Sequence, residues 1–335
     1  MSQEVAQTLV IASAQNYNLA ISAVAITIMV AGIAAGLGVA FGNRRLRMFG
    51  AEEFLQGVVN AAVLGAIAAI ISAINSISGE MVLGGTSVFS GCPEFAAQKT
   101  SVAFAACANG MIFDALAQTS AQLQSALFAL GYISKIVVSV PGLTVQPFFS
   151  LEFATSALSG ANAAFYFFSA IAAAHQGFLV YISTATFGMA LPAGFLLRAF
   201  FFTRKLGGAL ISIAVAFLLV YPLCFASISQ QLEAAYQKIG ELGQAASQFS
   251  SDFGGLLDIQ PTDSGFYASV QKTIADRQIA QMASALLSQS MLLSSQLFIC
   301  LIAIPAIGLA LACVFAGGLY RFLGGEMLGG AYDYI

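Results

Sequence analysis

Residues 292–320 read LLSSQLFICLIAIPAIGLALACVFAGGLY, a run without one charged side chain. Four more apolar runs occupy residues 19–41, 54–77, 163–191 and 206–226, and 59% of the whole chain is hydrophobic. A helix that crosses the hydrocarbon of a bilayer needs about 20 consecutive apolar residues. The sequence therefore predicts an all-α, polytopic protein of the cell membrane with about five transmembrane helices.

The basic residues indicate an orientation for these helices. Short turns after the first and third runs, and the tail after the fifth, hold seven of the twelve Lys and Arg residues: Arg44, Arg45, Arg47, Arg198, Arg204, Lys205 and Arg321. Cytoplasmic loops carry the excess of such residues. We expect the N-terminus outside, the C-terminus in the cytoplasm, and these seven residues as a basic collar suited to anionic lipid headgroups.

This topology divides the chain into five segments. Residues 1–77 form an outer tail and the first two transmembrane helices; the tail carries Glu4 and no basic start, so we expect no cleaved signal peptide. Residues 78–162 form an extracytoplasmic insert, residues 163–226 the third and fourth transmembrane helices, and residues 227–291 a second extracytoplasmic insert. Residues 292–335 form the fifth helix and a cytoplasmic tail. Inserts of this length usually carry structure or function of their own.

The first insert opens with a Gly-rich stretch and then has apolar residues at helical spacing between about residues 98 and 138. Cys92 and Cys107 both lie in this insert, on the side of the membrane where disulfides persist. We therefore expect them to be bonded to each other. A metal site is the weaker alternative, because no His and no third Cys lies nearby in the sequence. Pro141 and Pro147 should stop the helix before the chain re-enters the membrane.

The second insert has the pattern of a helical hairpin. Its first arm, about residues 228–249, places Leu232, Ile239, Leu242 and Phe249 along one stripe, and its second arm continues into the fifth transmembrane helix. We expect the chain to oligomerise, because the apolar faces of both inserts exceed what five helices can cover. A ring is then more natural than a dimer for a conduit.

Few residues within the membrane runs are unusual. His175, beside Gln176, is the only histidine, and either a pore or relay function or a plain hydrogen bond between helices would explain it. Four glycines of the first run have small-xxx-small spacing, which allows helices to approach closely within one chain or between subunits: Gly32, Gly36, Gly38 and Gly42. Pro305 should kink the fifth helix.

Enzyme motifs are absent from the sequence, which has no phosphate loop of the G-x-x-x-x-G-K-[ST] type and no H-E-x-x-H. We expect no catalytic residue, no cofactor and no metal. The membrane runs also lack the central carboxylates that proton- or sodium-coupled transporters use.

Three basic segments mark the cytoplasmic side of the predicted topology: FGNRRLRMFGAEEF (residues 41–54), LLRAFFFTRKLGGAL (196–210) and LYRFLGGEMLGG (319–330). With an outer N-terminus, five spans and a large insert between spans two and three, the chain resembles the polytopic inner-membrane subunit of type IV secretion and conjugation systems. Its archaeal relative, the Ced-type DNA-import membrane protein, is the nearer case, and the absence of Trp and the low charge are compatible with archaea. The resemblance implies an oligomeric channel or scaffold that passes DNA or protein and is driven by a separate ATPase. A small-molecule channel or transporter and a structural subunit of a cell-surface complex remain alternatives.

Overall fold

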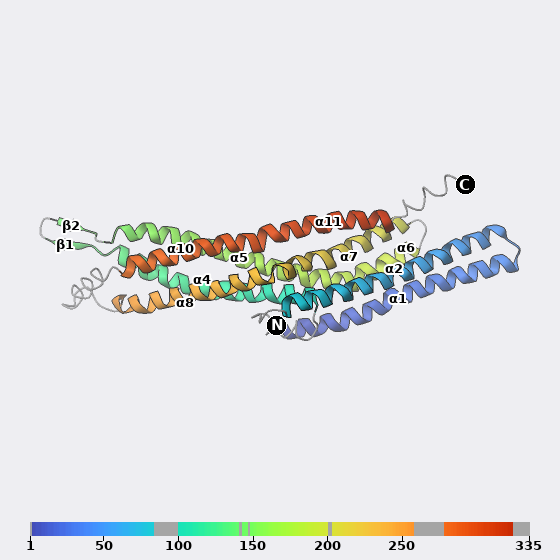
Figure 1. Cartoon of the computed structure of the whole chain (residues 1–335), viewed down its shortest axis with the longest axis horizontal. Coiled ribbons are helices and arrows are strands. Elements are labelled where there is room, and N and C mark those ends of the chain that lie inside the picture. The colour runs from blue at the N-terminus through green and yellow to red at the C-terminus, as the bar shows by residue number, and fades with distance from the viewer. Residues whose placement is uncertain are drawn as a thin grey trace. The chain divides into compact units, whose positions relative to one another are not determined.

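The computed structural model describes residues 2–83, 100–140, 143–146, 148–199, 203–257 and 278–323. Within these ranges the chain forms seven continuous helical rods and one short β-hairpin, so the predicted all-α class holds with that small addition. Its helices are α1 (Ser2–Ala40), α2 (Arg44–Leu83), α4 (Ser101–Ser134), α5 (Ser150–Ala185), α6 (Leu191–Ala199), α7 (Arg204–Ser227), α8 (Ser229–Leu257), α10 (Gln278–Phe298) and α11 (Ile304–Leu323) (Figure 1).

Two of the rods contain a π-helical segment ahead of a proline. The segment η2 (Thr186–Ala190) joins α5 to α6, and η4 (Ile299–Ala303) joins α10 to α11. Pro192 and Pro305 each stand two residues beyond the π segment. A proline lacks the N–H that continues the helical hydrogen bonds, and π-bulges and prolines are common causes of helix irregularity. The irregularity expected at Pro305 is therefore a π segment just before it.

The strands β1 (Val138–Val140) and β2 (Leu143–Val145) pair antiparallel between α4 and α5, with Val138 opposite Val145. The sequence analysis did not predict this hairpin. Pro141 and Pro147 lie outside the described residues, whereas α4 itself already ends at Ser134.

The chain divides into two compact units. The first unit comprises Met1–Cys107, Gln176–Ser229 and Ile304–Ile335, and the second comprises Ala108–His175 and Gln230–Ala303. The boundaries fall inside α4 and α5, after the first residue of α8, and between η4 and α11, so each unit is built from segments distant in sequence.

In the first unit, α1 and α2 form an antiparallel hairpin (Figure 1). Gly42 makes the turn with a φ of 61°, a conformation that glycine adopts without steric cost. Asn43 then caps α2, because its Oδ1 accepts hydrogen bonds from the backbone N–H groups of Arg45 and Leu46 at 3.1 and 3.3 Å. The basic turn is therefore built from a glycine turn and a helix cap.

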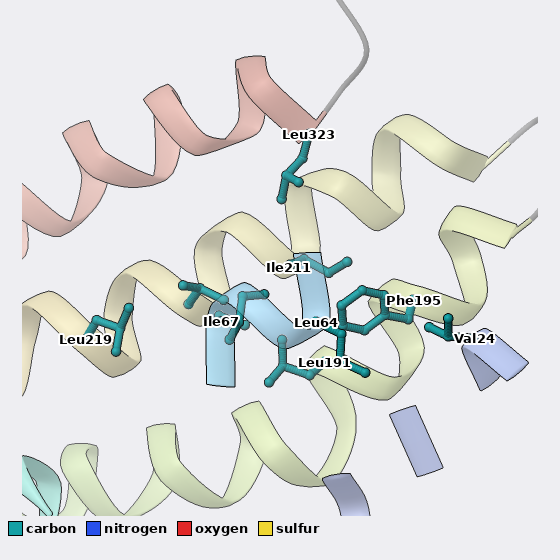
Figure 2. Packing of buried hydrophobic residues seen from close by; sticks show 10 residues of the cluster. Val24, Leu64, Ile67, Leu191, Phe195, Ile211, Leu219 and Leu323 are labelled. Carbon is teal, nitrogen blue, oxygen red and sulfur yellow. The ribbon is translucent and has the colours of Figure 1, made fainter. Parts of the chain in front are cut away.

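The core of the first unit lies where α1, α2, α6, α7 and α11 meet. Ile211 and Phe195, which are 0% and 1% exposed, occupy its centre. Figure 2 shows these side chains with those from the other helices of the cluster: Val24, Leu64, Ile67, Leu191, Leu219 and Leu323. In this cluster the end of α11 packs against α6 and α7, the helices before and after the second basic turn.

The second unit is a four-helix bundle in which each neighbouring pair of helices shares a hydrogen bond. Thr119 on α4 donates to the Ile239 carbonyl on α8 at 3.0 Å. Lys238 on α8 donates to Gln296 on α10, and Tyr166 on α5 donates to Gln124 on α4. The ring of four is completed by a contact between α5 and η4, described below.

This bundle corrects the prediction that another subunit must cover the two insert helices. Leu116, Leu123 and Leu130 on α4 are 0% exposed, as are Leu232 and Ile239 on α8. The predicted stripes on residues 98–138 and 228–249 were therefore right, but they pack inside the chain's own bundle. The apolar excess that led us to expect oligomerisation does not exist on these faces.

Six helices are long and apolar enough to cross a membrane: Ile21–Ala40, Arg44–Ser76, Ser101–Ser134, Leu151–Arg198, Arg204–Ser227 and Ile279–Leu323. Five of them coincide with the predicted runs. The sixth is α4, which we expected outside the membrane; its mean hydropathy of 1.2 is the lowest of the six. The chain is a multi-pass helical membrane protein.

Candidate functional site: the basic end of the first unit and the His175 bridge

An ion pair in the first unit joins the helices α2 and α7, which follow the two basic turns. Arg204, the first residue of α7, donates from Nη2 to Oε1 of Glu53 on α2 at 2.7 Å. Each of these side chains is only 19% exposed, so the pair is largely shielded from solvent. The start of α7 therefore lies beside the early turns of α2.

The third basic segment reaches the same end. Near the other end of α7, a Cβ added to Gly308 of α11 would lie 2.8 Å from Cys224 Sγ. Leu323, at the end of α11, packs in one cluster with Ile211, near the start of α7. Because α11 thus runs antiparallel to α7, Arg321 lies at the end that holds Arg204.

The seven residues of the basic collar therefore lie toward the same end of the first unit, spread over several helical turns. Two acids, Glu52 and Glu53, lie at this end among the described residues. With the seven basic residues they give a formal charge of +5. The collar was predicted from sequence as a membrane-topology signal; its gathering at one end is consistent with that origin. The sequence analysis did not predict the pairing of Glu53 with Arg204, although it placed both on the same side.

Arg198 is the unusual member of this collar. Its Nη1 is buried and has no hydrogen-bond partner among the described residues. Its charge interacts with that of Arg204. Its backbone stands so close to Gly207 that a Cβ added there would lie 2.6 Å from the Arg198 nitrogen. Arg198 is thus held against the first turn of α7, next to a second guanidinium.

His175 forms the contact that completes the bundle of the second unit. Its Nε2 lies 2.8 Å from the Leu301 carbonyl oxygen in η4. A carbonyl only accepts, so Nε2 carries the proton and donates. Leu301 stands four residues before Pro305, which has no N–H to offer the Leu301 carbonyl. His175 therefore offers a donor to a carbonyl that cannot bond to residue 305, which agrees with the predicted hydrogen bond between helices; the pore or relay stays a prediction. Gln176, its neighbour, is partly buried and belongs to the first unit.

The four glycines singled out in the sequence have different surroundings. Gly38 is buried, and a Cβ added there would overlap the backbone nitrogen of Arg47, so it permits the close approach of α1 and α2. Gly32 and Gly36 are exposed, with open space around an added Cβ. Gly42 makes the turn. Gly50 on α2, which the sequence analysis did not single out, contacts Ala35 equally closely.

The cysteines behave in two ways. Cys224, Cys300 and Cys313 are free thiols; Cys300 is buried, whereas Cys313 faces outward from α11. Cys107 on α4 is not one of these free thiols. Its predicted partner, Cys92, lies outside the described residues, so the bond between them stays a prediction.

A polar groove of about 420 Å³ runs between α4 and α8 in the second unit. Gly240 leaves it open, and the lining is rich in amides with a single carboxylate: Asp114, Gln118, Gln122, Gln237 and Gln244. This face of the bundle has the character of a surface in contact with water. No group of three His, Cys, Asp or Glu side chains gathers anywhere in the part of the chain that the structure describes.

Comparison of the chain with protein-family models, with curated proteins and with solved structures found no match. The fold alone therefore defines the class of the protein. It is a multi-pass helical membrane protein with a basic end on its first unit and a helical bundle as its second.

Proposed function

We propose that this chain is a membrane-embedded channel or scaffold subunit of a machine that moves DNA or protein, similar to type IV secretion and DNA-import systems. The observation that carries the proposal is the gathering of both basic turns at one end of the first unit, through Glu53 and Arg204. That arrangement supports the five-span topology on which the resemblance rests.

The support comes from the number of times the chain can cross the membrane between Glu53 and Arg204. Between Glu53 and Arg204 the chain passes through α2, α4 and the rod formed by α5, η2 and α6. Three complete crossings would leave the two residues on opposite sides of the membrane, where they could not pair. Two crossings return the chain to the starting side. The ion pair therefore supports two crossings, with one of the three rods outside the membrane.

The surface of α4 favours it as the rod that stays outside. Between Asp114 and Ser125 its exposed positions are polar or alanine, including Gln118 and Gln124. Exposed carboxylates and amides are costly against lipid. In this account the N-terminus is outside, the basic collar is cytoplasmic, and α4 and α8 belong to extracytoplasmic inserts. A separate ATPase and other secretion subunits would bind from the respective sides.

Deletion of the gene in its native host tests the proposal. We expect DNA transfer into or between cells, or export of specific proteins, to fall at least tenfold while growth is unchanged, with recovery when the wild-type gene is restored. Complementation with Glu52→Gln, an exposed position that leaves the ion pair intact, serves as the matched control and should restore transfer.

The alternatives give other outcomes. Loss of uptake of one solute, with DNA transfer and the secreted proteins unchanged, would favour a small-molecule channel or transporter. A changed cell surface with all transport intact would favour a structural subunit. Either result would contradict the translocation proposal.

A further inference from the structure

We propose that Arg198, with Arg204 and the first turn of α7, forms a specific site for a phosphate-bearing anion, and that its occupant in the cell is the phosphate of an anionic lipid headgroup. The site lies at the basic end of the first unit. It is independent of what the protein transports and of which side of the membrane this end faces.

The first step of the argument is the charge balance. Arg204 is paired with Glu53, so that carboxylate is already engaged. Arg198, whose backbone packs against the first turn of α7 at Gly207, adds a second positive charge near Arg204. Glu52, the other acid at this end in the described ranges, is exposed. Glu53 is engaged by Arg204, so the described residues show no ion pair for Arg198.

The second step is the orphaned donor. Arg198 Nη1 is buried and has no acceptor among the residues that the structure describes. A buried donor without a partner is costly, most of all on a charged group, and each such case in a native protein calls for an explanation such as a bound ion. An anion seated on Arg198 would satisfy this nitrogen and balance the pair of guanidinium groups together.

The third step is the nature of the anion. The planar fork of a guanidinium matches two oxygens of a phosphate, with both charge and geometry. Arg198 ends one candidate span and Arg204 begins the next, so the site lies at the level where phospholipids carry their phosphates. The rest of the collar, five basic residues, raises the local concentration of anionic lipid.

The fourth step is that the site is held rigidly. A Cβ added to Gly207 would lie 2.6 Å from the Arg198 nitrogen, and one added to Gly194 would lie 2.6 Å from Ile211 Cγ1. These two glycines therefore allow α6 and α7 to cross closely. Thr203, ahead of α7, gives no side-chain cap to the helix, because its hydroxyl donates to the Leu197 carbonyl at 2.6 Å. The first N–H groups of α7 therefore add donors beside Arg198.

The experiment compares Arg198→Met with Lys205→Met in the full-length protein. The two variants lose the same charge at the same end, but Lys205 is exposed. Each protein is purified in a zwitterionic detergent and titrated in three arms with phosphatidylglycerol, phosphatidylcholine or inorganic phosphate. Thermal unfolding by circular dichroism and retained lipid by native mass spectrometry are the two readouts.

We expect phosphatidylglycerol to raise the melting temperature of the wild type and of Lys205→Met, and to remain bound to both. Arg198→Met should show no rise, and at least tenfold weaker retention of lipid, while melting no lower than the wild type without lipid. Equal losses in both variants would reduce the site to the diffuse attraction of the collar and overturn the proposal. A response to inorganic phosphate equal to that with phosphatidylglycerol would overturn the lipid assignment.

Arg198→Lys covers the case in which Arg198→Met does not fold. It keeps the charge and loses the fork, so retention should be intermediate. Retention equal to that of the wild type would show that no guanidinium site exists.

Discussion

His175 is a residue for which the sequence left two roles open, a pore or relay and a hydrogen bond between helices. In the structure its Nε2 donates to the carbonyl of Leu301, and Pro305, four residues beyond Leu301, has no N–H for that carbonyl. The sequence could predict that a histidine there needs a partner. It could not predict a backbone carbonyl 126 positions further along the chain.

A double-mutant cycle tests this pairing. His175→Ala should lower the free energy of unfolding by about 1–3 kcal/mol, because a buried carbonyl loses its donor. In a Pro305→Ala background the same change should cost less, since residue 305 then supplies an N–H to the helix. Unfolding titrations in detergent of the four proteins give the coupling energy. Equal costs of His175→Ala in both backgrounds would disprove the link between His175 and Pro305.

Glu53 is the acid on which the basic end depends. Glu53→Gln should lower the free energy of unfolding by about 1–3 kcal/mol, because Arg204 loses the charged acceptor in a mostly buried position. Glu52→Gln is the matched control, since Glu52 is exposed and its removal should cost less than about 0.5 kcal/mol. Similar effects of the two changes in thermal unfolding would argue against a specific pair.

At the level of helices, the apolar periodicity predicted where the helices lie, but it did not predict what packs against their apolar stripes. The stripes of α4 and α8 were predicted at the right residues, because apolar spacing is a local property. What covers a stripe depends on tertiary contacts such as Thr119 with Ile239, which no local pattern reveals. For the same reason the sequence suggested a second subunit where the chain covers itself.

The glycines of α1 allow a matched test of close packing. Gly38→Ala should destabilise the protein by about 1–3 kcal/mol, because the added Cβ overlaps the backbone of α2. Gly36→Ala adds the same methyl group in open space and should stabilise the helix by about 0.5–1 kcal/mol.

Unfolding in detergent separates these two variants, and native mass spectrometry then shows whether Gly36→Ala alters any oligomer. Equal stabilities would contradict the packing of α1 on α2. Loss of an oligomer in Gly36→Ala alone would assign the open glycine face of α1 to a contact between subunits.

The disulfide between Cys92 and Cys107 remains a prediction at this scale. It would close a loop for which the chain-entropy model gives about 3 kcal/mol of stabilisation. Mass spectrometry of the unreduced protein, digested with free thiols blocked, should find one peptide that joins the two cysteines. Recovery of both as blocked thiols would refute the bond, and Cys300, a buried free thiol, serves as the internal control.

For the whole molecule, the account depends on how many times the chain crosses the membrane. The sequence predicted five crossings, and length and composition admit a sixth helix, α4. Hydropathy alone cannot separate a weakly apolar span from a helix buried in a bundle, because both need apolar residues. The ion pair between Glu53 and Arg204 favours an even number of crossings between them, and we propose on that ground that α4 is the helix that does not cross.

Cysteine accessibility in intact cells measures this topology directly. Arg45→Cys, Lys205→Cys and Gln118→Cys are introduced one at a time and treated with a membrane-impermeant maleimide before and after permeabilisation, with the unsubstituted protein as the background. We expect position 118 to be labelled in intact cells, and positions 45 and 205 only after permeabilisation. Labelling of positions 45 and 205 from opposite sides would mean that α4 crosses the membrane, and would contradict the account.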